Sequence, residues 1–221
     1  MKHSKTLQHD SVESASTSTA TKMLTACAES FQCVCKSWWN IDRNDEEKRR
    51  NLLFINQKDG TFKEEAQRYG LADQGHSTVA TFFDYDNDGD LDMYLLNTPS
   101  NNFKQKLAYM EVNEIPYTFS DKLFRNDGNE IFSDQTKAAG VESYSFGMGV
   151  VASDVNQDGY MDLYIANDYE KPDRYLINQG NGTFKDNLSR QFKHTSYSSM
   201  GTDISDMNND GFMDIMVVDM Q

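Results

Sequence analysis

The stretch FFDYDNDGDLDMYLLN, residues 82–97, decides the fold. Aspartates stand at every second position from Asp84 to Asp92, and a single glycine, Gly89, lies among them. Like charges this close together repel one another unless a cation lies between them. Calcium fits best, because it accepts about six to eight oxygen ligands in a flexible cage. The stretch therefore predicts a calcium-binding loop that leads into an apolar strand.

The same loop returns at residues 154–162 (DVNQDGYMD) and 206–214 (DMNNDGFMD). In each copy a glycine occupies the tight turn, where a positive φ is expected. We predict up to three structural Ca²⁺ ions, held by side-chain oxygens and by the backbone carbonyl at the seventh loop position. The predicted ligands are Asp84, Asp86, Asp88, Asp90 (carbonyl) and Asp92; Asp154, Asn156, Asp158, Tyr160 (carbonyl) and Asp162; and Asp206, Asn208, Asp210, Phe212 (carbonyl) and Asp214.

An EF-hand is the main alternative for this pattern, but it requires a glutamate at loop position 12 and flanking helices. Position 12 is Leu95, Ile165 or Val217 in the three copies, and β-forming residues follow each loop. The loops are therefore expected to join strands.

The loops belong to a longer repeat. A phenylalanine precedes each loop by the same interval, and each phenylalanine follows an asparagine after a glycine-containing turn such as NDGNEIF. These turns, flanked by apolar runs, indicate β-hairpins. The loops are 52 residues apart between the second and third copies and 70 between the first and second, which places an insertion at residues 98–120.

Each unit is predicted to contain four strands, named A to D. They are expected at 78–83, 91–96, 122–126 and 130–134 in one unit, and at 147–152, 161–166, 174–178 and 182–186 in the next. Strand B is apolar on both faces, so it should be covered on both sides. Short four-stranded antiparallel sheets stacked side by side describe β-propeller blades. The predicted fold is all-β, with calcium loops in a partial propeller.

The repeat region is predicted to span residues 51–221 as two full blades and two half blades, the halves being 51–66 (strands C and D) and 198–218 (strands A and B). Closed propellers need about four to eight blades, so we expect further blades in a longer protein. Residues 1–50 form an atypical leader without the apolar core of a signal peptide. Its first 25 residues are Ser/Thr-rich and expected to be disordered, and 31–37 are predicted to form a strand.

Composition excludes several function classes. The net charge of −14 argues against nucleic acid as a partner, and no apolar run is long enough to insert into a membrane. Three clustered cysteines do not form a disulfide framework. His76 and His194 fall in connections of different blades, and no catalytic motif occurs. We expect a non-catalytic protein; the alternative is the scaffold of a carbohydrate-active enzyme whose active site lies in missing blades.

The D-x-D/N-x-D-G-x-x-D loop between two strands, together with turns such as NQGNGTF, resembles the FG-GAP/VCBS repeat family over roughly residues 51–219. The resemblance is to integrin-α-like calcium-binding propellers, in their bacterial and cartilage-acidic-protein-like branch. It implies an extracellular or cell-surface adhesion module with a protein or glycan ligand.

Antiparallel connectivity predicts that the A–B loops and C–D turns share one end of the blades. The insertion at 98–120, a B–C connection, would then lie at the other end. Apolar and aromatic residues within it, Phe103, Tyr109, Met110, Tyr117 and Phe119, suit contact with a ligand. The alternative is a loop that packs on its own blade.

Loop one should bind calcium more tightly than loops two and three. Asn156 and Asn208 keep an oxygen at the third position but remove a negative charge, and ligand charge sets calcium affinity. Calorimetric titration should show that Asp84→Ala removes the tightest site, whereas Asp206→Ala leaves it intact. Survival of the tightest site in Asp84→Ala would contradict this ranking.

Overall fold

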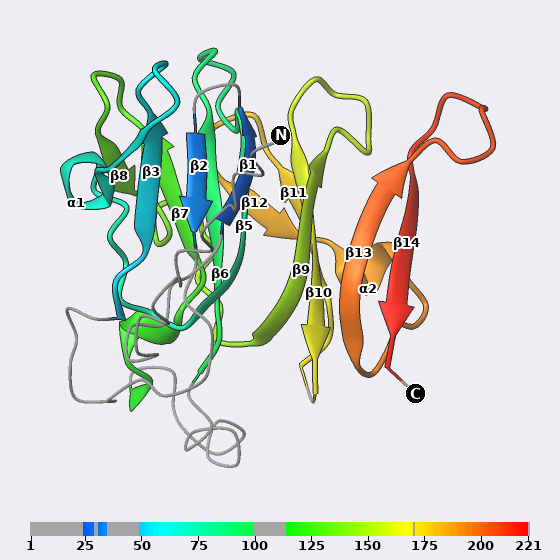
Figure 1. Cartoon of the computed structure of the whole chain (residues 1–221). Helices are drawn as coiled ribbons and strands as arrows, with labels where there is room; N and C mark the ends of the chain where they lie inside the picture. The colour runs from blue at the N-terminus through cyan, green and yellow to red at the C-terminus, as the bar shows by residue number, and fades with distance from the viewer. Residues whose placement is uncertain (1–23, 29–30, 35–48, 100–113, 170, 221) are drawn as a thin grey trace, which may run out of the picture.

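The computed structural model describes residues 24–28, 31–34, 49–99, 114–169 and 171–220, which form three four-stranded antiparallel sheets and one two-stranded sheet (Figure 1). The first sheet contains β1 (Leu24–Ala28), β2 (Phe31–Val34), β3 (Leu52–Asn56) and β4 (Phe62–Glu64). The second contains β5 (Ser77–Phe83), β6 (Asp92–Asn97), β7 (Lys122–Asn126) and β8 (Phe132–Asp134). The third contains β9 (Phe146–Ser153), β10 (Asp162–Asp168), β11 (Arg174–Asn178) and β12 (Phe184–Asp186), and the last contains β13 (Ser199–Ser205) and β14 (Asp214–Asp219).

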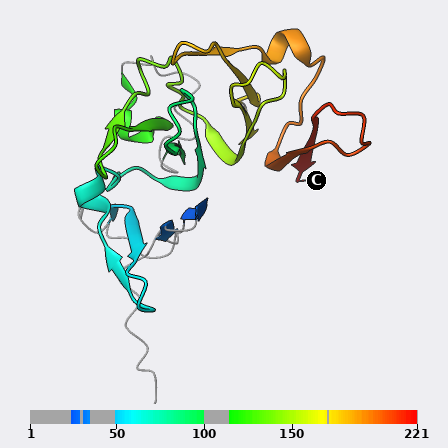
Figure 2. The same cartoon turned by 90° about the horizontal axis from the view of Figure 1, so that it is seen from above.

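The sheets follow one another along an arc (Figure 2), and their A strands contact each other in sequence, β1 with β5, β5 with β9, and β9 with β13. Glycine permits the closest of these approaches. A Cβ added at Gly149 would lie 3.0 Å from the Cα of Gly201 in the next sheet. The sheets are therefore blades of an open, partial propeller, as the sequence predicted. Short helices, α1 (Ala66–Tyr69) and α2 (Leu188–Gln191), lie in two connections between blades.

The core lies between blades, which confirms the prediction for strand B. Every residue of β6 and β10 is buried. Met93 and Leu95 pack with Leu53 of the preceding blade, whereas Tyr94 and Leu96 pack with residues of the following blade, including Leu163. In contrast, β14 is only partly buried. Each four-stranded sheet thus shields the apolar face of its neighbour from water.

The first blade differs from the prediction. Residues 51–66 were expected to supply a half blade behind a largely disordered leader, but β1 and β2 pair with β3 and complete a four-stranded sheet. The predicted strand at 31–37 is β2, whereas β1 falls partly within the stretch expected to be disordered. Only residues 29–30 separate β1 from β2, so this blade has no aspartate loop, and the loop was the signal used to find the repeats.

The described part of the insertion packs against the blades rather than projecting. Residues 100–113 lie outside the described part of the chain, but Ile115 and Phe119 are buried against Phe146 of the following blade. The Phe119 ring also meets the His76 ring, with centroids 5.7 Å apart. Tyr117, in the short 3₁₀ helix η4 (Tyr117–Phe119), donates a hydrogen bond to Asp134. Phe119 therefore follows the alternative in which the insertion packs on the blades, whereas Tyr117 stays partly exposed.

The two ends of the blades carry different connections. The A–B loops and the C–D turns lie at one end, the upper end in Figure 1, which we call the loop face. The B–C connections lie at the opposite face. Among the described residues, no helix is long and apolar enough to cross a membrane.

A buried carboxyl, Asp121, lies at the head of β7. It accepts hydrogen bonds from the Asn97 amide (3.0 Å) and the Tyr94 hydroxyl (3.4 Å), and burial raises its pKa to about 7. The equivalent residue in the next blade, Asp173, accepts from the Asn167 amide and from two hydroxyls, those of Tyr164 and Ser199. The two aspartates thus occupy the same place with different numbers of donors.

Asp121→Asn should flatten the pH dependence of stability in the absence of metal. A carboxyl whose pKa is higher in the folded than in the unfolded state favours folding below about pH 4, and this contribution disappears as the pH rises through about 7. Urea unfolding in chelator between pH 4 and 8 measures the effect. Asp173→Asn, the control, should lower stability by roughly 1–3 kcal/mol at neutral pH, because it disturbs three hydrogen bonds. An unchanged pH profile in Asp121→Asn would contradict the assignment.

Candidate functional site

The three aspartate loops occupy equivalent places, between β5 and β6, β9 and β10, and β13 and β14. The first aspartate closes each turn by accepting two backbone amides. Asp84 accepts from the amides of Asp88 (3.2 Å) and Gly89 (3.0 Å). Asp154 and Asp206 do the same in their loops, at 2.9–3.1 Å. The glycine has a positive φ in all three copies, between 87° and 91°, so the loops share one backbone shape.

The ninth loop position is the most buried. Asp92 is fully buried and accepts from the amides of Tyr85 (3.0 Å) and of Asn126 (2.8 Å), at the end of β7. Asp162 is fully buried in the same place and accepts from the Asn178 amide at 2.8 Å. Burial raises the pKa of Asp92 to about 7 and that of Asp162 to about 6. The loops thus hold carboxylates where their negative charge is costly.

Two carboxylate oxygens in these loops are buried and have no hydrogen-bond partner among the described residues, Oδ1 of Asp86 and Oδ2 of Asp162. In loop one, carboxylate oxygens of Asp84, Asp86 and Asp88 all lie within 4.8 Å of one another. Burial and the neighbouring Asp88 charge also raise the pKa of Asp86. Unpaired oxygens facing other carboxylates are the chemistry of a hard-cation site. The donor set therefore fits calcium.

Loops two and three differ from loop one at the third position. The Asn156 side chain donates to the Asp158 carboxylate at 2.9 Å, and Asn208 donates to Asp210 at 3.0 Å. The uncharged asparagine side chain donates a hydrogen bond where loop one has a third carboxylate. Repulsion between carboxylates is therefore weaker in loops two and three than in loop one. At the seventh position, where a carbonyl ligand was predicted, the amides of Asp90, Tyr160 and Phe212 donate to the fifth-position aspartate at 2.9 Å. The ninth-position Asp214 accepts from the Met207 amide at 3.1 Å and is only half-buried.

The sequence analysis missed the residues that join one loop to the next. At the fourth position, the side-chain amide of Asn87 donates to the Gly159 carbonyl in loop two (3.0 Å), and that of Gln157 donates to the Gly211 carbonyl in loop three (2.5 Å). Side-chain amides stand at the fourth position of all three loops. This shared chemistry was the signal that could have found them.

A pocket opens on the opposite face, at the third blade. Its volume is about 620 Å³. Most lining residues come from the connection before β9, from the end of β10, from the segment around the start of β11, and from the end of β12 and α2. Ile115 of the insertion also lines it, together with residues such as Tyr144, Asn167, Lys171, Arg174 and Ser189. The Arg174 guanidinium lies between the Val141 carbonyl (2.9 Å) and the Asp186 carboxylate (3.3 Å). Charged, hydroxyl and aromatic groups therefore meet in one cavity.

One polar atom of the pocket residues lacks a partner. In the second blade, Oδ1 of Asn97 accepts a hydrogen bond from Ser77, the residue paired with it across the strands (2.7 Å). In the third blade, Asn167 pairs with Gly147, and its Oδ1 has no partner among the described residues. A side chain at position 147 would collide with Leu96, 2.9 Å from an added Cβ. Because Leu96 of the second blade packs against position 147, the third blade has no side chain there to donate to Asn167 as Ser77 donates to Asn97.

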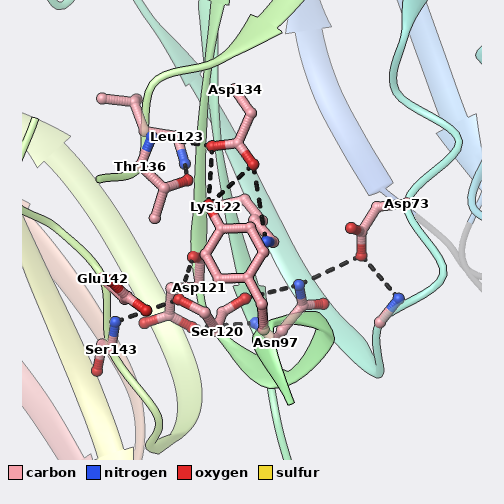
Figure 3. Close-up of polar contacts among 12 residues, drawn as sticks. Asp73, Asn97, Ser120, Asp121, Lys122, Leu123, Asp134, Thr136, Glu142 and Ser143 are labelled. Carbon is pink, nitrogen blue, oxygen red and sulfur yellow. Dashed lines mark hydrogen bonds and ion pairs between the residues drawn. The ribbon is translucent and has the colours of Figure 1, made fainter. Parts of the chain in front are cut away.

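The corresponding region of the second blade is filled by its own polar contacts (Figure 3). The Asn97 side-chain amide donates to Asp73 (3.3 Å) and to the Ser120 carbonyl (2.9 Å). Lys122 lies over the Tyr117 ring, 2.9 Å from its centroid, and 3.7 Å from Asp134. These groups satisfy each other, which leaves the third-blade pocket as the stronger candidate for ligand contact on this face.

Comparison with protein-family models agrees with the repeat pattern. A family model described as FG-GAP-like repeat matches residues 39–95 and 154–217, more than half of the chain, and these regions contain all three aspartate loops. No curated protein matches the chain. A solved structure of an Agrocybe aegerita lectin, described for specific recognition of non-reducing terminal N-acetylglucosamine, is similar at 14% identity and a TM-score of 0.40. The similarity covers 76% of this chain and 41% of the lectin chain.

Proposed function

Because the chain belongs to the FG-GAP-like repeat family, we propose that it is a calcium-stabilised propeller module that binds a protein or glycan ligand without catalysing a reaction. The observation that carries the calcium part is the pair of buried, unpartnered carboxylate oxygens on Asp86 and Asp162. Both oxygens belong to residues that the loop pattern selects as ligands. A cation would neutralise charges that burial otherwise penalises.

Calcium has a structural role in this proposal. The loops lie at the ends of buried strands. The ninth-position aspartates Asp92 and Asp162 accept hydrogen bonds from backbone amides at the ends of β7 and β11. An ion bound to the folded loops, and not to the unfolded chain, stabilises the fold by mass action. The amide-for-carboxylate exchange in loops two and three suits the weaker affinities of extracellular modules. The resemblance to integrin-α-like propellers supports placing the module outside the cell or on its surface.

The ligand is assigned to the face opposite the loops. The pocket near Arg174 offers a cavity of about 620 Å³ with hydroxyl, charged and aromatic groups, the mixture that polar ligands require. On this assignment the metal maintains the blades and the other face recognises the ligand. Adhesion would follow from presenting that face to a partner surface.

Removal of calcium should lower the melting temperature. Without the ion, burial and the neighbouring loop aspartates would again disfavour the charged forms of Asp92 and Asp162. We therefore expect the melting temperature to fall by several degrees in excess EDTA and to recover with added calcium. Asp92→Asn should reduce the gain on adding calcium, because it removes the charge of a predicted ligand. Asp90→Asn is the control, since only its carbonyl is a predicted ligand. Identical melting curves with and without calcium would contradict the metal assignment.

Filling the pocket should abolish ligand binding. Ser189 is an exposed residue of α2 that lines the cavity, so Ser189→Trp would occupy the space without entering the core. The wild-type protein, loaded with calcium, is screened against a glycan array and a library of extracellular proteins. We expect saturable binding without turnover, reduced at least tenfold by Ser189→Trp.

Arg190→Trp is the matched control, because Arg190 is an exposed neighbour on α2 outside the lining residues. Equal binding by Ser189→Trp and wild type would remove the pocket from the proposal. Conversion of a glycan to products would favour the enzyme alternative.

A further inference from the structure

Adjacent loops are linked directly at the loop face. The Asn87 side-chain amide in loop one donates to the backbone carbonyl of Gly159 in loop two, at 3.0 Å. Asn87 lies between two predicted ligands, Asp86 and Asp88. Gly159 immediately precedes Tyr160, whose carbonyl is a predicted ligand of the second site. The hydrogen bond therefore joins the ligand-bearing backbone of one site to that of the next.

A second connection joins the same two loops through their buried aspartates. The Tyr85 amide donates to Asp92 in loop one (3.0 Å), and the Tyr85 carbonyl accepts from the Asn178 side chain of the following blade (2.7 Å). The backbone amide of Asn178 in turn donates to Asp162 in loop two (2.8 Å). The ninth-position aspartates of neighbouring sites are thus connected through two residues, Tyr85 and Asn178.

Loops two and three have one such connection among the described residues. Gln157 occupies the place of Asn87 and donates to the Gly211 carbonyl at 2.5 Å. The fourth-position residues share a left-handed backbone, with φ of 60° at Asn87, 62° at Gln157 and 61° at Asn209. Asn209 makes no hydrogen bond to another loop among the described residues. It therefore has the conformation of the linking residues without the link.

We propose that these hydrogen bonds couple the calcium sites, so that occupancy of one loop raises the affinity of the next. The inference rests on the proposed calcium binding. An empty loop holds repelling carboxylates, and an ion fixes both their positions and the backbone between them. Fixing Asn87 and Tyr85 holds the Gly159 carbonyl and Asn178 in place, so loop two has less to order when it binds. Because coupling is reciprocal, loop two assists loop one equally.

The coupling should be larger between loops one and two, which share two connections, than between loops two and three. One hydrogen bond corresponds to about a 2- to 10-fold change in an equilibrium constant. Asn87, Gln157 and Asn178 are positioning residues in this scheme, since none is itself a predicted metal ligand. A purely structural role would change stability but would leave the sites independent of one another.

A double-mutant cycle on the full chain tests the coupling, with calcium binding measured by calorimetry. Asp84→Ala disables loop one, and we expect it to weaken binding at the remaining loops about 2- to 10-fold. Asn87→Gly removes the side-chain link and keeps a residue suited to positive φ. In the Asn87→Gly background, the effect of Asp84→Ala on the remaining loops should shrink. Adding Asn178→Ala should abolish it.

Asn209→Gly is the matched control, because it makes the same change at the same backbone geometry, where the described part of the chain has no link between loops. It should leave the effect of Asp84→Ala intact. The coupling is overturned if Asp84→Ala weakens the remaining loops equally with and without the Asn87 and Asn178 side chains, or leaves them unaffected in every background. If the wild-type chain binds no calcium at all, the proposed metal function fails with it, which is a distinct result from independent but functional sites.

Discussion

The second strand of each blade is apolar on both faces, and this constraint shapes the whole molecule. β6 and β10 are buried along their entire length, which a single sheet exposed to water on one side cannot achieve. Each blade therefore needs a neighbour on both sides. The partly buried β14 illustrates the opposite case, since no four-stranded sheet follows it among the described residues. The stability of each blade consequently depends on packing against its neighbours.

Much of this arrangement could be predicted from the spacing of the aspartate loops and glycine turns and from the distribution of apolar residues along the strands. The A to D strands of the second and third blades lie within two residues of their predicted ranges, because loop aspartates and turn glycines fix the register of short hairpins. The first blade was only half predicted, since β1 and β2 lack an aspartate loop. The links made by Asn87 and Asn178 could not be predicted, because they join residues 72 and 93 positions apart. Such pairs require the relative placement of two blades, which local patterns do not contain.

The two faces of the blades separate two kinds of polar group. At the loop face, the buried carboxyl of Asp92 accepts two backbone amides, and burial raises its pKa to about 7. At the opposite face, carboxylates such as Asp173 are held by amides and hydroxyls. On the proposed calcium binding, an ion would complete the first arrangement, whereas the Asp173 carboxylate already has protein donors. A metal requirement at one face is therefore compatible with a fixed surface at the other.

The link between loops also has a direction. The third blade carries both parts of the link, since Gln157 donates to the loop of the next sheet and the Gly159 carbonyl accepts from Asn87 of the blade before it. The contact is heterologous, because the two surfaces that meet are different. A duplicate of this blade would bring its own donor and acceptor and could pack beside it through the same contact. Tandem duplication of such a blade would therefore extend the series without requiring a new kind of contact.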